Sequence, residues 1–170
     1  RAPPAVPGEV FRHTAAARGL AEAEISAART ERKAIGAVKV HVRAPERGLV
    51  RTYANIRNII DESGLSPRVK ADSHKVFALL AEAEGRIHSR SVDQVHFHEL
   101  GSVDTMVDVA GSVAGLEYLG VEELLCSPLP MGTGMIKTSH GIYPVPAPAV
   151  VEILKDVPDY TSGIPTENVT

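Results

Sequence analysis

The stretch VHFHELGSVDTMVDVAG, residues 95–111, joins a short alternating segment to the start of an apolar helix. His96 and His98 alternate with apolar residues, so an extended backbone points both imidazoles to one face of a strand. A glycine and a serine then break the strand, and apolar residues at helical spacing predict a helix over 102–119. We therefore expect a buried strand–helix unit around which the rest of the chain is arranged.

The clearest helix upstream of this unit covers residues 67–88. Ser66 supplies an N-cap hydroxyl, Pro67 suits the first helical position, and apolar residues follow at helical spacing. The other elements are expected as a helix over 11–24, strands over 25–30 and 37–43 joined at Gly36, a helix over 52–62, a buried strand over 122–128, a hairpin of 135–138 with 141–145, a final helix ending at 155, and a turn-rich tail over 156–170.

Composition bounds the class of protein. With 170 residues, 44% of them hydrophobic and 23% charged, the chain predicts a single α/β (or α+β) domain over 1–170, with a mixed sheet and helices. The net charge of −3 and the 4% aromatic content argue against a nucleic-acid surface, and no apolar run reaches the roughly 20 residues of a membrane span. One cysteine, Cys126, excludes an internal disulfide and favours the cytoplasm; its apolar neighbours predict a buried, inert thiol.

The central stretch carries the densest chemistry. His96, His98 and Glu99 offer imidazole and carboxylate donors for a metal ion. Asp104 and Asp108 lie one turn apart, so their carboxylates share a helix face. Simpler interpretations remain open: a half-exposed strand explains the histidines, and compensation of the helix dipole explains Asp104.

A second candidate site follows the central helix. Gly132, Gly134, Lys137 and His140 could surround an anion near a helix that starts within 146–149. The alternative is a hairpin whose glycines serve only its turns. A dinucleotide-binding fingerprint is excluded, because Lys137 stands where the third glycine belongs.

Glu84 and His88 form a further pair, four residues apart on the predicted helix over 67–88. Such a pair can share a proton or a metal ion, but a surface ion pair is the favoured interpretation.

Three segments resemble one family: VHFHELGSVDTMVDVAG (95–111), SPLPMGTGMIKTSHGIYPVPAPAVVEILK (127–155) and LAEAEGRIH (80–88). They resemble, in the expected order, the nickel-insertion proteins of the lactate racemase cofactor pathway, the LarC family. The resemblance implies a nickel insertase of the cyclometallase or chelatase type, classed as a lyase. It would insert nickel into a pyridinium-3,5-bisthiocarboxylic acid mononucleotide, giving the nickel-pincer nucleotide of lactate racemase.

The resemblance also implies roles for the candidate residues. His96, His98 and Glu99 would handle nickel; Glu99, Asp104 and Asp108 would form the catalytic group; Gly132, Gly134, Lys137 and His140 would hold the nucleotide phosphate. The family step depends on CTP with Mn²⁺ or Mg²⁺, and the CTP site is expected outside this chain. A homo-oligomer, lactate racemase and a sulfur-insertion protein are the implied protein partners.

Departures from the family pattern set the extent of the match. The family's opening Gly-x-x-Gly-Asp-Met segment does not precede Arg1, and the loop over 44–50 contains no histidine. The chain therefore looks like a fragment of the N-terminal half of a longer protein, which by itself would not complete turnover. A nickel-binding or metallochaperone module without catalysis, and another metal-dependent enzyme such as a hydrolase, are the alternatives.

Overall fold

The computed structural model describes residues 24–43, 51–97, 100–138 and 140–166. Helices and strands are mixed along the chain, which confirms the predicted class, and in the described ranges the strands form four two-stranded sheets. In chain order the elements are β1 (Glu24–Arg32), β2 (Ile35–Arg43), β3 (Arg51–Thr52), α2 (Tyr53–Asp61), α3 (Pro67–His88), the 3-10 turn η1 (Val92–Gln94), β4 (His96–Phe97), α4 (Val103–Tyr118), β5 (Leu129–Met131), β6 (Met135–Thr138), β7 (Gly141–Pro144), α5 (Pro148–Ile153) and β8 (Asp159–Thr161).

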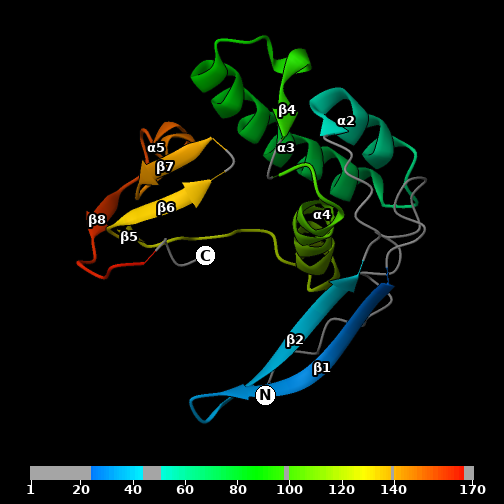
Figure 1. Ribbon diagram of the computed structural model, residues 1–170. Helices are drawn as coiled ribbons and strands as arrows, with labels where there is room; N and C mark the ends of the chain where they lie inside the picture. The colour runs from blue at the N-terminus through cyan, green and yellow to red at the C-terminus, as the bar shows by residue number, and fades with distance from the viewer. Residues whose placement is uncertain (1–23, 44–50, 98–99, 139, 167–170) are drawn as a thin grey trace.

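These elements form three parts (Figure 1). The body consists of α2, α3 and α4 with the short β3–β4 pair. The arm is the β1–β2 hairpin, which extends away from the body. The lobe contains β5 to β8 and α5, and α5 packs against α3.

The core lies in the body, where apolar faces of three helices and one strand meet. Ile56 of α2 and Phe77 of α3 are completely buried, and Phe97 of β4 and Met106 of α4 are 2% exposed. Burying each large apolar side chain contributes about 2–3 kcal/mol, so this cluster is the main source of stability. It also places β4, and with it His96, against the helices.

Side-chain caps define where the helices of the body begin. The Ser66 hydroxyl accepts a hydrogen bond from the Val69 amide at 3.2 Å, and Ser102 does the same for Thr105 at 3.2 Å. The Ser66 hydroxyl also lies 2.8 Å from a carboxylate oxygen of Glu117, and so ties the start of α3 to the end of α4. The predicted start of the first of these helices and its end at residue 88 are confirmed.

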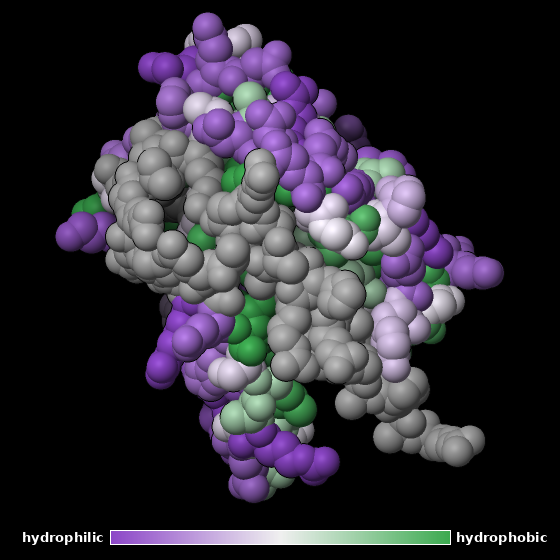
Figure 2. Space-filling model, turned by 90° about the vertical axis from the view of Figure 1, so that its right-hand side faces the viewer, coloured by the Kyte–Doolittle hydropathy of each residue, from purple (hydrophilic) through white to green (hydrophobic). Residues whose placement is uncertain are grey.

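The arm confirms the two predicted strands but corrects their turn. The strands are longer than expected and pair antiparallel from Glu24 opposite Arg43 to Arg32 opposite Ile35. The turn falls on Lys33 and Ala34, whose φ angles are 48° and 63°, and not at Gly36, which lies inside β2. Alternation predicted the strands, but in a hairpin the pairing register decides which two residues turn. Apolar side chains of β2 are exposed on the arm (Figure 2).

The predicted buried strand over 122–128 is wrong. The segment between α4 and β5 has no strand partner in the described part of the chain, and Leu124 and Leu125 are 75% and 83% exposed. Cys126 is exposed as well, so the expectation of a buried thiol also fails. An apolar run becomes a buried strand only where a neighbouring strand and a covering layer are available.

The lobe contains one strand pairing that was not predicted, because the tail over 156–170 was expected to consist of turns. Leu129–Met131 pairs in parallel with Asp159–Thr161, whereas the β6–β7 hairpin has its predicted limits to within one residue. The predicted final helix is shorter than expected, because α5 ends at Ile153. The predicted helix over 11–24 lies outside the described residues except for Glu24, which begins β1. Among the described helices, none is both long enough and apolar enough to cross a membrane.

Candidate functional site

His96 lies on β4 with its side chain exposed, and the flanking Val95 and Phe97 are buried. The predicted alternation is therefore confirmed for these three residues. β4 is held by antiparallel pairing with β3, in which His96 faces Thr52. His98 and Glu99, the other two predicted nickel ligands, lie outside the described residues.

Asp104 and Asp108 both lie on α4 and are exposed. Asp104 is in the first turn, where the positive end of the helix dipole favours a carboxylate. Partial burial raises the pKa of the Asp108 carboxyl, and the negative charge of Asp104 raises it further. A cation beside this pair would relieve the repulsion between the two carboxylates. A carboxyl group whose pKa is raised in this way is a candidate for a functional role.

The raised pKa of Asp108 makes stability depend on pH with a definite sign. The folded protein binds this proton more tightly than the unfolded chain, so ionisation of Asp108 lowers stability as pH rises through the ordinary and then the raised pKa. Asp108→Asn is therefore expected to raise the thermal midpoint relative to the unsubstituted protein more at pH 7 than at pH 3.

Asp72→Asn is the matched control with the opposite sign. A hydrogen bond from Lys75 lowers the pKa of Asp72, so the ionised carboxylate stabilises the folded protein. Replacing Asp72 by asparagine should therefore lower the thermal midpoint more at pH 7 than at pH 3. Scanning calorimetry at the two pH values measures both. Equal behaviour of the two variants would contradict the assignment for Asp108.

The glycine-bearing loop and the β6–β7 hairpin hold the second group of predicted residues. Gly132 is buried, whereas Gly134 is exposed with a φ of 117°, a conformation that glycine adopts readily. The carbonyl of Gly134 accepts a hydrogen bond from the amide of Val145 at 3.0 Å, so this glycine helps to close the hairpin. Lys137 is exposed on β6. α5 begins with Pro148, which has no amide hydrogen, so the predicted contribution of this helix start to anion binding is reduced.

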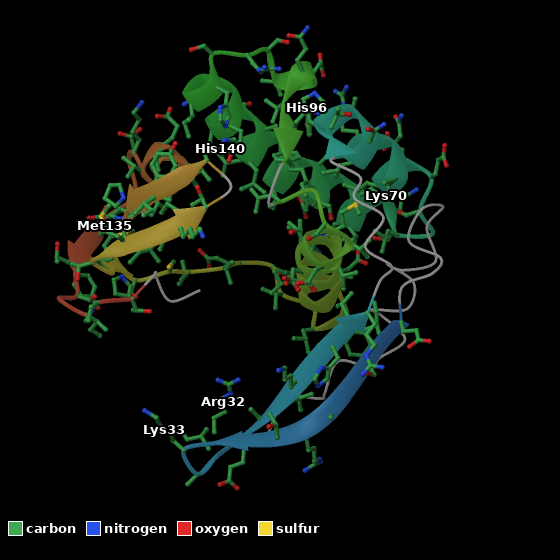
Figure 3. The ribbon with its side chains drawn as sticks, in the orientation of Figure 1. Arg32, Lys33, Lys70, His96, Met135 and His140 are labelled. Atoms are coloured by element: carbon green, nitrogen blue, oxygen red, sulfur yellow. The ribbon has the colours of Figure 1, made fainter. Side chains whose placement is uncertain are left out.

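His140 lies between β6 and β7, at the end of the hairpin that faces α3 (Figure 3). Its ring centroid is 5.0 Å from that of His88, with the ring planes tilted by 50°. Glu84 completes the group, because its Oε2 lies 3.3 Å from Nε2 of His88. We refer to Glu84, His88 and His140 as the bridging cluster, since it joins α3 to the lobe.

An ion pair between α3 and α5 holds the lobe beside this cluster, and a lysine of the lobe shares its carboxylate. Nη1 of Arg86 lies 2.6 Å from Oε1 of Glu152 on α5, and Nζ of Lys155 lies 3.1 Å from Oε2 of the same carboxylate. The hydrogen bond that Arg86 donates to Glu152 lowers the pKa of this carboxyl group most, and the hydrogen bond from Lys155 lowers it further. The contact between His88 and His140 is therefore supported by specific docking of α5.

The bridging cluster is the group that sequence reasoning missed. Spacing along one helix revealed Glu84 and His88 as a pair, and glycine content marked the loop of His140 separately. No local pattern in the sequence predicts a contact between His88 and His140, which are 52 positions apart. Among the described residues, no three histidine, cysteine, aspartate or glutamate side chains are already arranged as a metal site.

The family model and the similar curated proteins all point to one family. A family model described as "Nickel insertion protein" matches residues 4–170. A protein of Geotalea uraniireducens named "Putative nickel insertion protein" is 46% identical over 89% of this chain and 39% of its own length. A protein of Staphylococcus saprophyticus named "Pyridinium-3,5-bisthiocarboxylic acid mononucleotide nickel insertion protein" is 41% identical over 89% of this chain and 39% of its own length.

The chain spans about two fifths of the length of the curated relatives it matches. No solved structure gives a significant match to it.

Proposed function

Because this chain belongs to the nickel insertion protein family, we propose that it works, as part of a longer protein, in inserting nickel into pyridinium-3,5-bisthiocarboxylic acid mononucleotide. The observation that carries the proposal is the 41% identity to a relative whose name states this reaction. The substrates are a nickel ion and a small nucleotide that carries two thiocarboxylates and a phosphate. The protein has to hold the metal, hold the nucleotide and bring the two together.

We propose that His96, His98 and Glu99 bind the nickel ion. Imidazole and carboxylate donors bind borderline divalent ions and release them more readily than a set of thiolates does. Ready release suits an ion that is a substrate. The exposure of His96 on β4 supports this role, because an incoming ion can reach its ring.

The acidic pair on α4 has a separate proposed role. Asp104 and Asp108 would bind a second divalent cation or orient the histidines, and Glu99 would act with them as the catalytic group. The raised pKa of Asp108 supports a cation, since a positive charge there would replace a repulsion by an attraction.

Nucleotide binding is proposed for the lobe. Lys137 extends from β6 and can pair with the phosphate, and His140 can donate to it. Gly134 is exposed and leaves the loop backbone accessible at its position, whereas buried Gly132 would shape the loop from below. A lysine ammonium and an imidazole suit an anion, and the glycines lack side chains that would block it.

Finer points of the activity are proposals that rest on the family. They are a chelatase or cyclometallase type of lyase reaction, dependence on CTP with Mn²⁺ or Mg²⁺, a CTP site outside this chain, action in the cytoplasm, and maturation of lactate racemase.

The test of the nickel assignment is a calorimetric titration of the chain with Ni²⁺. His96→Ala/His98→Ala is expected to lower the affinity at least tenfold, because loss of two imidazoles removes most of the donor set. His41→Ala is the matched control, since His41 lies on β2 of the arm. Unchanged affinity in a folded double variant would overturn the assignment of these histidines.

A further inference from the structure

The arm carries an apolar face that is increasingly exposed toward its tip. Residues two apart on a strand share a face, so Val38, Val40 and Val42 of β2 lie on one side of the hairpin. Val42, at the end nearer the body, is partly buried, whereas Val40 is 39% and Val38 is 65% exposed (Figure 1). A two-stranded hairpin with an uncovered apolar face is only marginally stable in water, so this face favours a partner surface.

Two neighbouring cross-strand pairs on the outer part of this face are complementary to each other. In one pair Arg29 stands opposite Val38, and in the next Glu31 stands opposite Gly36. Arg29 and Glu31 are exposed, and within the ranges that the structure describes neither of them takes part in an ion pair. A Cβ on Gly36 would meet nothing within 4 Å, so open space lies above this glycine. One strand therefore presents two opposite charges, and the other presents a projecting valine beside a gap.

We propose that this face binds the same face of a second copy of the chain, with the two hairpins antiparallel about a two-fold axis between these two pairs. Such an axis brings Arg29 of each copy over Glu31 of the other, and Val38 of each copy over Gly36 of the other. Sheets that pack face to face lie about 10 Å apart, a distance that an arginine and a glutamate side chain span together. A parallel arrangement would instead place Arg29 over Arg29, which like-charge repulsion opposes.

The rest of the arm agrees with this arrangement. The opposite face carries Arg32, Lys39 and Arg43, which stay in solvent when the two apolar faces meet. At the tip, Ala34 of one copy lies over Val40 of the other, so the overlap ends before it reaches the body. Only the outer parts of the two arms overlap, which is less surface than a stable dimer buries, so the association is weak and depends on concentration. The inference is independent of the proposed function.

The test is sedimentation velocity of the whole chain from about 10 µM to about 1 mM, where the unsubstituted protein is expected to pass from monomer to dimer. Arg29→Glu and Glu31→Arg should each raise the dissociation constant about tenfold, because each places like charges opposite one another twice. The double variant Arg29→Glu/Glu31→Arg should restore the original affinity, since it only exchanges the two signs. Lys39→Glu is the matched control: it changes the net charge as Arg29→Glu does, but it lies on the opposite face and should leave the dissociation constant unchanged.

Gly36→Val tests the contact made by the other strand. A valine side chain fills the gap that Val38 of the second copy requires, so this variant is expected to stay monomeric even at the highest concentration. Its fold should be unimpaired, because the space above Gly36 is open within one copy and valine is favoured in a strand. Circular dichroism checks the fold of every variant.

Three results would overturn the proposal. The first is a chain that remains monomeric over the whole range of concentration. The second is a dimer whose affinity Gly36→Val leaves unchanged. The third is a double charge exchange that weakens the dimer as much as the single substitutions do, since the pairing of Arg29 with Glu31 requires that the exchange restore it.

Discussion

Phe77→Ala is expected to lower the free energy of unfolding by about 3–5 kcal/mol, because truncating a fully buried aromatic ring leaves a cavity that the surrounding helices cannot fill. Phe77 has no exposed surface and belongs to the cluster that includes Ile56, Phe97 and Met106. It therefore links α3 with α2, β4 and α4. Total stabilities of single domains are only about 5–15 kcal/mol, so the variant should unfold at a much lower urea concentration.

Leu79→Ala on the same helix is the matched control, because Leu79 is 48% exposed. Its cost should remain below about 1 kcal/mol, as for most surface substitutions. Urea unfolding followed by circular dichroism measures both. Similar losses in the two variants would contradict the position of the core.

Gly85→Val is expected to cost about 2–3 kcal/mol through overpacking at the end of α3. A Cβ on Gly85 would lie 3.0 Å from the carbonyl oxygen of Arg90 and 3.5 Å from Cγ2 of Val95. The backbone at Arg90 cannot simply move away, because its amide donates to the Gly85 carbonyl at 2.9 Å. Valine then adds two methyl groups to a space that already lacks room for one.

Gly36→Val provides the control for this prediction. A Cβ at Gly36 meets nothing within 4 Å, and valine is favoured in a strand such as β2. This variant should be as stable as the unsubstituted protein or slightly more so. If Gly85→Val unfolds at the same urea concentration as Gly36→Val, the close approach of α3 to the segment that leads into β4 is incorrect.

Displacement at Gly85 also bears on the candidate sites. Glu84 and His88 lie on the same final turns of α3, and Val95 precedes His96. The bulk of a valine side chain would therefore shift residues of the bridging cluster and the segment that carries His96. A lower Ni²⁺ affinity in a partly folded Gly85→Val protein would reflect this shared support.

Local rules were sufficient for the elements whose determinants lie within a few residues of one another. A serine N-cap followed by proline, with apolar residues three and four apart, predicted α3, and alternation predicted the outward direction of His96. The β6–β7 hairpin followed from its turn residues. Short sequence motifs were likewise sufficient to identify the family, and the match of the family model over residues 4–170 confirms it.

Local rules failed where the outcome depends on a neighbour that the pattern does not contain. The apolar residues of 122–128 were predicted to be buried, yet Leu125 is 83% exposed, because burial requires a partner surface. The parallel partner of β5 comes from Asp159–Thr161, a segment with no strand pattern of its own.

The sequence by itself determined the helices of the body, the strands of both hairpins and the family, because hydrogen bonds and side-chain contacts over a few residues decide local elements. Only the tertiary structure decided that His88 meets His140. That contact depends on the docking of α5 on α3, where Arg86 pairs with Glu152 at 2.6 Å across 66 positions of sequence. An ion pair of this kind forms only after both elements have folded and packed, so no pattern within either segment encodes the distance between the two imidazoles.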